Sequence, residues 1–233
     1  KLAVAGYHPL VVLLGGMITG GLTGLVNGLL IVRGRIPPII ATLGTMNLLR
    51  ALVFTLLGGR WISGIPMEVR SFTLGRWLGI PIPVAVMLAL AIVCHYFLTM
   101  RPTGRHIYAV GGNPEAAALA GIDANRILYL VYSLTGVLVA LSGYIYIGRG
   151  GLVQTNAGEG FELQVIAATV LGGTSILGGR GTVIGSFLGA LLVGILRNGL
   201  ILLNVPALWE GVIVGTLILV AVVFDLLGKR GNR

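Results

Sequence analysis

Charged residues are scarce in this sequence, and acidic residues are the scarcest of them. Only 10% of the 233 residues are charged and 7 are acidic, whereas 56% are hydrophobic. Roughly 25% of the residues of a soluble domain are charged, so this chain has too few polar residues to cover a soluble fold. The composition therefore excludes an ordinary soluble protein and indicates a protein of the lipid bilayer.

Cysteine and lysine are also nearly absent, and each absence excludes a kind of chemistry. A single cysteine, Cys94, rules out a disulfide framework within the chain. Lysine occurs only at Lys1 and Lys229, so the sequence has no Gly-x-x-x-x-Gly-Lys-Ser/Thr phosphate-binding loop. The three histidines have no metal-ligand spacing. We therefore expect no enzymatic activity, no metal site and no bound cofactor.

The excess of positive charge does not indicate a nucleic-acid partner. The net charge is +9, but the 16 basic residues are scattered singly between apolar runs and form no basic face with interleaved aromatic residues. In a membrane protein such residues report topology, because cytoplasmic loops are enriched in Lys and Arg. We therefore expect no nucleic acid among the partners.

Long apolar runs dominate the sequence. A membrane-spanning helix needs about 20 apolar residues, at 1.5 Å each, to cross a hydrocarbon layer of roughly 30 Å. The seven runs that reach or approach this length are 10–32, 36–57, 80–100, 127–148, 163–178, 182–203 and 211–227. The fifth run is short and rich in glycine, so it is either a span or a broken or re-entrant segment. The pattern predicts an all-α fold, a polytopic transmembrane helical bundle that forms one domain over residues 1–233.

The distribution of basic residues predicts the orientation of these spans. Alternating crossings place nine basic residues on one side of the membrane and five on the other. The nine are Arg33, Arg35, Arg101, Arg105, Arg126, Arg180, Lys229, Arg230 and Arg233. By the positive-inside rule this side is cytoplasmic, so we expect the C-terminus in the cytoplasm.

Carboxylates are missing from the predicted spans, apart from Asp225 near an inner end. Carriers coupled to an ion gradient usually hold an ionisable group at mid-membrane, because that group couples ion movement to solute movement. The absence favours a passive transport pathway that another subunit drives. An ion-coupled secondary transporter remains the alternative, and a membrane-embedded scaffold protein is the third hypothesis.

Small residues recur in the predicted spans and at their edges at intervals of four, a spacing that lets helix backbones approach closely. We expect helix packing at two such stripes, which comprise Gly16, Gly20, Gly24 and Gly28, and Gly181, Gly185 and Gly189. Four polar residues inside spans offer hydrogen bonds either to a neutral polyhydroxylated solute or to neighbouring helices. These candidate pathway residues are Thr42, Thr45, Asn47 and Asn198.

The loop 101–126, predicted to be cytoplasmic, is too long for a simple turn and contains a short helix of its own. Asn113 is a good N-cap, Pro114 suits the first helical position, and Glu115 suits the positive end of the helix dipole. Gly121 supplies a left-handed stop. The small apolar face comprises Ala116, Ala117, Leu119 and Ala120. So short a helix needs a packing surface, which is either this chain's own helix ends or a separate cytoplasmic subunit.

Three stretches in this order resemble one known family along essentially the whole chain. They are IPPIIATLGTM at 36–46, GRHIYAVGGN at 104–113 and IAATVLGGTS at 166–175. The family comprises the permease subunits of bacterial ATP-binding cassette (ABC) importers for ribose and related monosaccharides, including the autoinducer-2 importers. The resemblance implies a type II ABC-importer-like fold in the bacterial inner membrane and import of a ribose-like sugar or autoinducer-2.

The resemblance also implies partners and a longer protein. Members of this family work with a second permease copy or paralogue, with cytoplasmic ATPase subunits that bind the ATP, and with a periplasmic or lipoprotein solute-binding protein. It makes the segment from Asn113 to Gly121 the coupling helix that contacts the ATPase. It implies about ten spans, of which seven lie in this sequence. Because the sequence begins at Lys1 and lacks a signal-peptide pattern, we expect earlier spans to precede it.

Overall fold

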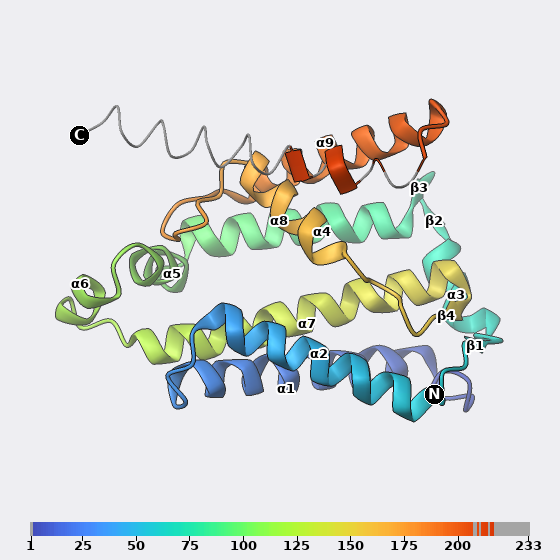
Figure 1. The fold of residues 1–233 in the computed structure, drawn as a ribbon, viewed down its shortest axis with the longest axis horizontal. Coiled ribbons are helices and arrows are strands. Elements are labelled where there is room, and N and C mark those ends of the chain that lie inside the picture. Colours follow the sequence, from blue (N-terminus) through green and yellow to red (C-terminus); the bar gives the residue numbers. More distant parts are fainter. Residues whose placement is uncertain (1, 207–208, 210, 214, 217–233) are drawn as a thin grey trace. The chain divides into compact units, whose positions relative to one another are not determined.

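The computed structural model describes residues 2–206, 209, 211–213 and 215–216. Its helices are α1 (Pro9–Val32), α2 (Pro38–Leu57), α3 (Met67–Leu74), α4 (Ile82–Met100), α5 (Pro102–Gly112), α6 (Pro114–Leu119), α7 (Ala124–Gly150), α8 (Phe161–Leu171) and α9 (Val183–Leu202). Its strands are β1 (Ile62–Ser63), β2 (Arg76–Trp77), β3 (Ile80–Pro81) and β4 (Leu152–Val153), paired antiparallel as β1 with β4 and β2 with β3. The regular secondary structure of the described chain is thus helical apart from two very short strand pairs (Figure 1).

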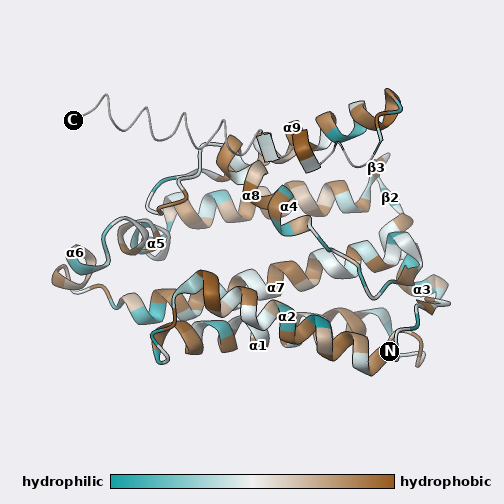
Figure 2. Cartoon of the chain, in the orientation of Figure 1, coloured by the Kyte–Doolittle hydropathy of each residue, from teal (hydrophilic) through white to brown (hydrophobic). Residues whose placement is uncertain are grey.

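Five helices of the described residues are long and apolar enough to cross a membrane: α1, α2, α4, α7 and α9. They contain 19 to 27 residues each, and at most 11% of the residues in any of these spans are buried. Many large apolar residues of these helices are therefore exposed, and Figure 2 shows hydrophobic residues along much of their length. A soluble protein would have buried them, so this surface fits lipid or further membrane helices. The prediction of a polytopic helical membrane protein is confirmed.

Two of the seven expected spans are not among these five helices. In the region 163–178, α8 ends at Leu171 after 11 residues, or about 16 Å, which is too short to cross the hydrocarbon layer as one helix. The chain leaves the helix through Gly172 and Gly173, the latter at a φ of +81° that favours glycine. The segment is therefore a broken one rather than a full span. The expected span 211–227 lies largely outside the described residues.

The described chain forms two compact units, and the first comprises Lys1–Ala89 and Asp123–Ala157. Its centre is the antiparallel pair α1 and α7, which lie side by side along their length (Figure 1). Helix α3 packs across α7, where Thr73 is 2% exposed and lies against Gly148. A small core of Ala3, Ile65, Val69 and Tyr144 closes this end of the unit.

Glycines bring α1 and α7 together. A Cβ atom on Gly20 would collide with the backbone of Gly136, and one on Gly24 would collide with the backbone of Tyr132. Gly28 lies against Tyr129, and a Cβ atom on Gly28 would be 3.0 Å from the tyrosine ring. Because no side chain separates the two backbones, the helices approach closely in the way that small-residue stripes permit.

The second unit comprises Leu90–Ile122 and Gly158–Arg233, so α4 contributes its later residues here and its earlier ones to the first unit. Helices α8 and α9 pack antiparallel, as their neighbouring ribbons show (Figure 1). Their core contains Ala167, Ala168 and Val193. Gly189 and Gly185 of α9 lie directly against the backbones of Ala168 and Gly172, respectively.

Candidate functional site

Helix α6 is short, and hydrogen bonds cap both of its ends. The Asn113 side-chain oxygen accepts a 3.0 Å hydrogen bond from the Ala116 amide, and Glu115 lies in the first turn. At the other end, the Gly121 amide donates to the Ala118 carbonyl and the Ile122 amide donates to the Ala117 carbonyl, both at 3.0 Å. This pair of bonds, with Gly121 at a φ of +80°, is a Schellman motif. The chain is thus held in a defined turn on either side of six helical residues.

Ala117 and Leu119, two apolar residues of α6, lie on opposite faces of the helix. Ala117 is 4% exposed, so it packs against this protein. Leu119 is 92% exposed, which is extreme for a leucine on a capped helix that lies outside the spans. The sequence grouped both residues on one face that needs a packing surface, either this chain's own helix ends or a separate subunit. The structure instead directs Ala117 inward, with Ala116, Leu119 and Ala120 left exposed.

The segment before α6 is also helical, which the sequence did not reveal. Helix α5 occupies 102–112, part of the predicted loop 101–126, and α7 begins at Ala124, where Asp123 accepts hydrogen bonds from two amides. Pro102 at the first helical position is the signal that was available. Gly104, Gly111 and Gly112 made the helix hard to predict, because each glycine is about 1 kcal/mol less favourable than alanine in a helix.

Two of these glycines, Gly111 and Gly112, are where helix α5 meets the turn after α8. A Cβ atom on Gly111 would lie 2.9 Å from the amide nitrogen of Gly179, and one on Gly179 would lie 2.5 Å from the Cα of Gly112. Gly178 and Gly179 both have positive φ, at +91° and +73°. The contact is therefore backbone against backbone, in a conformation that suits only glycine.

One long-range hydrogen bond fastens this contact. The Tyr108 hydroxyl donates to the Gly181 carbonyl oxygen at 2.9 Å, and Tyr108 is half-buried. On the other side of the turn, the hydroxyls of Thr174 and Ser186 are 3.1 Å apart, and the Ser175 amide donates to the Arg180 carbonyl at 2.9 Å. Helix α5 is thereby tied to the beginning of α9. Gly181 itself lies in this turn, against Thr174, rather than on the α8–α9 seam.

A cavity of about 770 Å³ opens in the first unit, along α1 and α7. Its lining is mostly apolar, and the side chains with a polar group that lie among it are Thr19, Thr23, Asn27, Thr42, Tyr132, Thr135 and Tyr144. None of the described residues that line it is charged. Gly16 lies on this cavity, and a Cβ atom added to it would meet nothing within 4 Å, whereas one on Gly20 would collide with α7.

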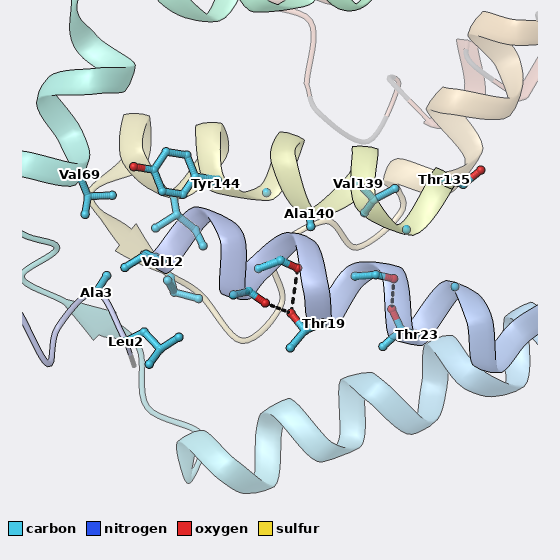
Figure 3. A pocket seen from close by; sticks show the side chains of 18 of the residues that line it. Leu2, Ala3, Val12, Thr19, Thr23, Val69, Thr135, Val139, Ala140 and Tyr144 are labelled. Carbon is cyan, nitrogen blue, oxygen red and sulfur yellow. Dashed lines mark hydrogen bonds between the residues drawn. The ribbon is translucent and has the colours of Figure 1, made fainter. Parts of the chain in front are cut away.

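The threonine hydroxyls of the cavity already donate to their own helices. Figure 3 shows Thr19 bonded to the carbonyls of Gly15 and Gly16, and Thr23 bonded to that of Gly20, each at 2.8 Å. A hydroxyl that donates its proton in this way keeps its oxygen lone pairs as acceptors. The cavity therefore offers acceptors to a guest that brings hydroxyl donors.

The four predicted pathway residues do not form one group. Thr42 lines the cavity, and the Thr45 hydroxyl lies 2.7 Å from the side-chain oxygen of Asn27, which also lines it. Asn47 is exposed and donates to the Leu43 carbonyl of its own helix at 3.1 Å. Asn198 is exposed on α9, which belongs to the second unit.

The residues that the sequence analysis missed follow a readable pattern. Thr19, Thr23 and Asn27 recur every four residues on α1, beside the glycines with the same interval. Residues four apart share a helix face, so the interval alone marks a polar stripe next to the packing stripe. Within the described part of the chain, no three His, Cys, Asp or Glu residues gather as metal ligands would.

Comparison with known proteins identifies the family. Residues 2–222 match the family described as the branched-chain amino acid transport system permease component. The chain is 42% identical to the ribose import permease protein of Bacillus subtilis (strain 168), over 95% of this chain and 70% of the relative. It is 40% identical to the ribose import permease protein of Escherichia coli (strain K12), over 94% of this chain and 69% of the relative.

A second kind of relative is nearly as similar. The autoinducer 2 import system permease protein of Photorhabdus laumondii is 37% identical over 95% of this chain and 66% of its own length. The chain thus spans about two thirds of the length of these relatives. No solved structure matches it. The family match over almost the whole chain, together with a helical membrane fold, shows that this chain belongs to the branched-chain amino acid transport system permease component family.

Proposed function

We propose that this chain is the permease subunit of an ABC importer and forms the pathway for a ribose-like monosaccharide or a related small polyhydroxylated solute such as autoinducer-2. The observation that carries the proposal is a capped helix outside the spans with an almost fully exposed Leu119, in a chain similar over 94–95% of its length to ribose and autoinducer-2 import permeases. The similarity supports this function over an ion-coupled carrier.

In this proposal the energy enters through α6. The sequence has no phosphate-binding loop, so ATP binds to a separate cytoplasmic ATPase subunit. Leu119 enters an apolar groove of that subunit, because burial of a fully exposed leucine side chain is worth roughly 1.5–3 kcal/mol. The Schellman motif at Gly121 holds the leucine in place before the partner arrives, which lowers the entropy lost on binding. The predicted topology puts α6 and the C-terminus on the cytoplasmic side.

The cavity along α1 supports a neutral, hydroxyl-rich solute. Its threonine oxygens act as acceptors, and a sugar carries several hydroxyl donors. A charged solute would lose its hydration without finding a counter-charge among the lining residues, which is costly. The face of α1 that bears Thr19, Thr23 and Asn27 therefore forms one wall of the pathway. A second permease and a solute-binding protein complete the importer.

Transport in reconstituted vesicles tests this function. The permease is inserted with its ATPase subunit, and the solute-binding protein and radiolabelled ribose or autoinducer-2 are added outside. We expect uptake that requires ATP on the ATPase side and persists when ionophores abolish ion gradients. Uptake that continues without the ATPase but stops when the ion gradient collapses would show an ion-coupled carrier instead.

A further inference from the structure

A tight hairpin connects α3 to α4. Strand β2 pairs with β3 so that Trp77 lies opposite Ile80 and Arg76 lies opposite Pro81. The two residues between the strands, Leu78 and Gly79, have φ angles of +52° and +80°. Two positive φ angles in a two-residue loop match a type I′ turn, whose preferred sequence is Asn-Gly or Asp-Gly.

Leucine at the first position of this turn is unusual. A positive φ crowds the Cβ atom of any residue with a side chain, and leucine has no polar group with which to compensate. Yet Leu78 is 86% exposed, so contacts within the protein do not stabilise it there. Trp77 beside it is 67% exposed and its cross-strand partner Ile80 is 45% exposed. The hairpin tip thus presents three large apolar side chains outward from a strained turn.

The hairpin is fixed to the start of a membrane span. The Ile82 amide, at the first residue of α4, donates to the Gly75 carbonyl at 3.0 Å, and this bond closes the base of the hairpin. The 19 residues of α4 measure about 28 Å, close to the roughly 30 Å of the hydrocarbon layer, so Ile82 lies near its edge. The two residues of strand β3 extend about 7 Å, which is comparable to the headgroup layer of about 5–8 Å on each side of the hydrocarbon.

We propose that the tip of the β2–β3 hairpin, Trp77 to Ile80, lies in the lipid headgroup layer and anchors the beginning of α4. Opposed residues of a strand pair share a face, so Trp77 and Ile80 enter the bilayer together with Leu78. Exposed Arg76 lies on the other face, where its guanidinium reaches lipid phosphate. Tryptophan and arginine at the end of an apolar helix are the residues that membrane interfaces favour.

Lipid fits the tip better than a protein partner does because the tip continues the exposed apolar surface of α4. None of the residues in the apolar window of α4 is buried, and only Pro81 separates Ile80 from that helix. The proposal concerns membrane contact alone. Its test therefore does not depend on which solute the permease carries or on what drives transport.

Fluorescence of Trp77 tests the proposal. The chain has three tryptophans, and the variant W61F/W209F leaves Trp77 as the only one. The permease is placed in vesicles whose phospholipids carry bromine near the headgroup end of the acyl chain, and acrylamide serves as the aqueous quencher. We expect strong quenching by the brominated lipid and weak quenching by acrylamide. In the same background, L78N should at least halve the lipid quenching, whereas L74N, at an exposed leucine of α3, should leave it unchanged.

The leucine-to-asparagine change distinguishes lipid contact from a merely structural turn. Asparagine suits the left-handed position better than leucine does, so L78N should fold at least as well. If L78N leaves lipid quenching intact, or if acrylamide quenches Trp77 as it quenches free tryptophan, the proposal is wrong. Acrylamide quenching that only the solute-binding protein suppresses would assign the tip to that protein and would also overturn the proposal. If W61F/W209F does not fold, a spin label at L78C in a C94S background gives the same depth information.

Discussion

The Tyr108 hydroxyl donates a 2.9 Å hydrogen bond to the carbonyl oxygen of Gly181, across 73 positions of sequence. Beside this bond, the backbones of Gly112 and Gly179 touch without an intervening side chain. Helix α5, which precedes the proposed coupling helix α6, is therefore joined at two points to the turn that begins α9. A movement of α6 would reach α9 through this rigid contact rather than through a flexible loop.

Removal of the Tyr108 hydroxyl should weaken this connection. We expect Tyr108→Phe to lower the free energy of unfolding by only about 1 kcal/mol, the usual net value of one hydrogen bond. A reconstituted importer that carries Tyr108→Phe should hydrolyse more ATP per solute molecule imported, because a movement of α6 then has less effect on α9. Tyr96→Phe is the matched control, since its ring lies 5.7 Å from the Arg101 guanidinium and phenylalanine keeps that ring. An unchanged ratio of ATP hydrolysed to solute imported would make Tyr108 purely structural.

The glycine contact predicts a sharp difference between two chemically identical substitutions. Gly179 and Gly158 have nearly equal φ angles, +73° and +75°, so alanine at either residue should cost roughly 1–2 kcal/mol of backbone strain. At Gly179 the added Cβ also meets Gly112, whereas at Gly158 it meets nothing within 4 Å. We expect Gly179→Ala to destabilise the detergent-solubilised protein by about 1–3 kcal/mol more than Gly158→Ala, the usual cost of overpacking. Thermal unfolding of both variants measures this, and equal shifts would refute the contact.

Local signals account for what the sequence predicted well. The α6 helix was readable because its caps, Asn113 and Gly121, lie within the segment that they terminate. Helix α5 was not readable, because a contact more than 60 residues away stabilises it against the low helix propensity of Gly111 and Gly112. The inward direction of Ala117 was equally hidden. Periodicity within one helix does not say which face a distant segment covers.

The polar stripe that lines the cavity could likewise be seen in the sequence, but its role could not. The stripe of Thr19, Thr23 and Asn27 was present in the sequence at the same interval as the glycines. Its role depended on where α7 packs, and the close approach of Gly24 to Tyr132 determines that. Once the glycine face is known to hold α7, the adjacent polar face lies on the cavity between the helices.

The exposed leucine of α6 provides the direct test of ATPase binding. We expect Leu119→Asp to abolish co-purification of the ATPase subunit while membrane insertion and thermal stability stay unchanged, since 92% of this residue is already exposed. Leu119→Met, which keeps the apolar volume, should retain the ATPase. Retention of the ATPase by Leu119→Asp at wild-type yield would contradict the assignment of α6.

The packing of α1 on α7 predicts opposite effects for two glycines of the same stripe, Gly16 and Gly24. Gly24→Ala introduces a Cβ that meets the backbone of Tyr132 and lies 3.0 Å from the Cα of Ser133. We expect it to destabilise the protein by about 1–3 kcal/mol. Gly16→Ala meets nothing and improves helix propensity, so it should be neutral or stabilising by up to about 1 kcal/mol. Unfolding in mixed detergent micelles distinguishes them, and a reversed order would show that the two helices pack differently.

The proposed pathway wall on α1 predicts a change in transport rather than in stability. Thr23→Val removes a hydroxyl that lines the cavity, and the loss of one hydrogen bond to a neutral solute should raise the KM for uptake about 2- to 10-fold. Thr55→Val is the matched control. Its hydroxyl also donates to its own helix, to the Ala51 carbonyl at 2.8 Å, but Thr55 does not line the cavity. If both variants change the KM equally, or neither does, the Thr23 hydroxyl does not contact the solute and the pathway lies elsewhere.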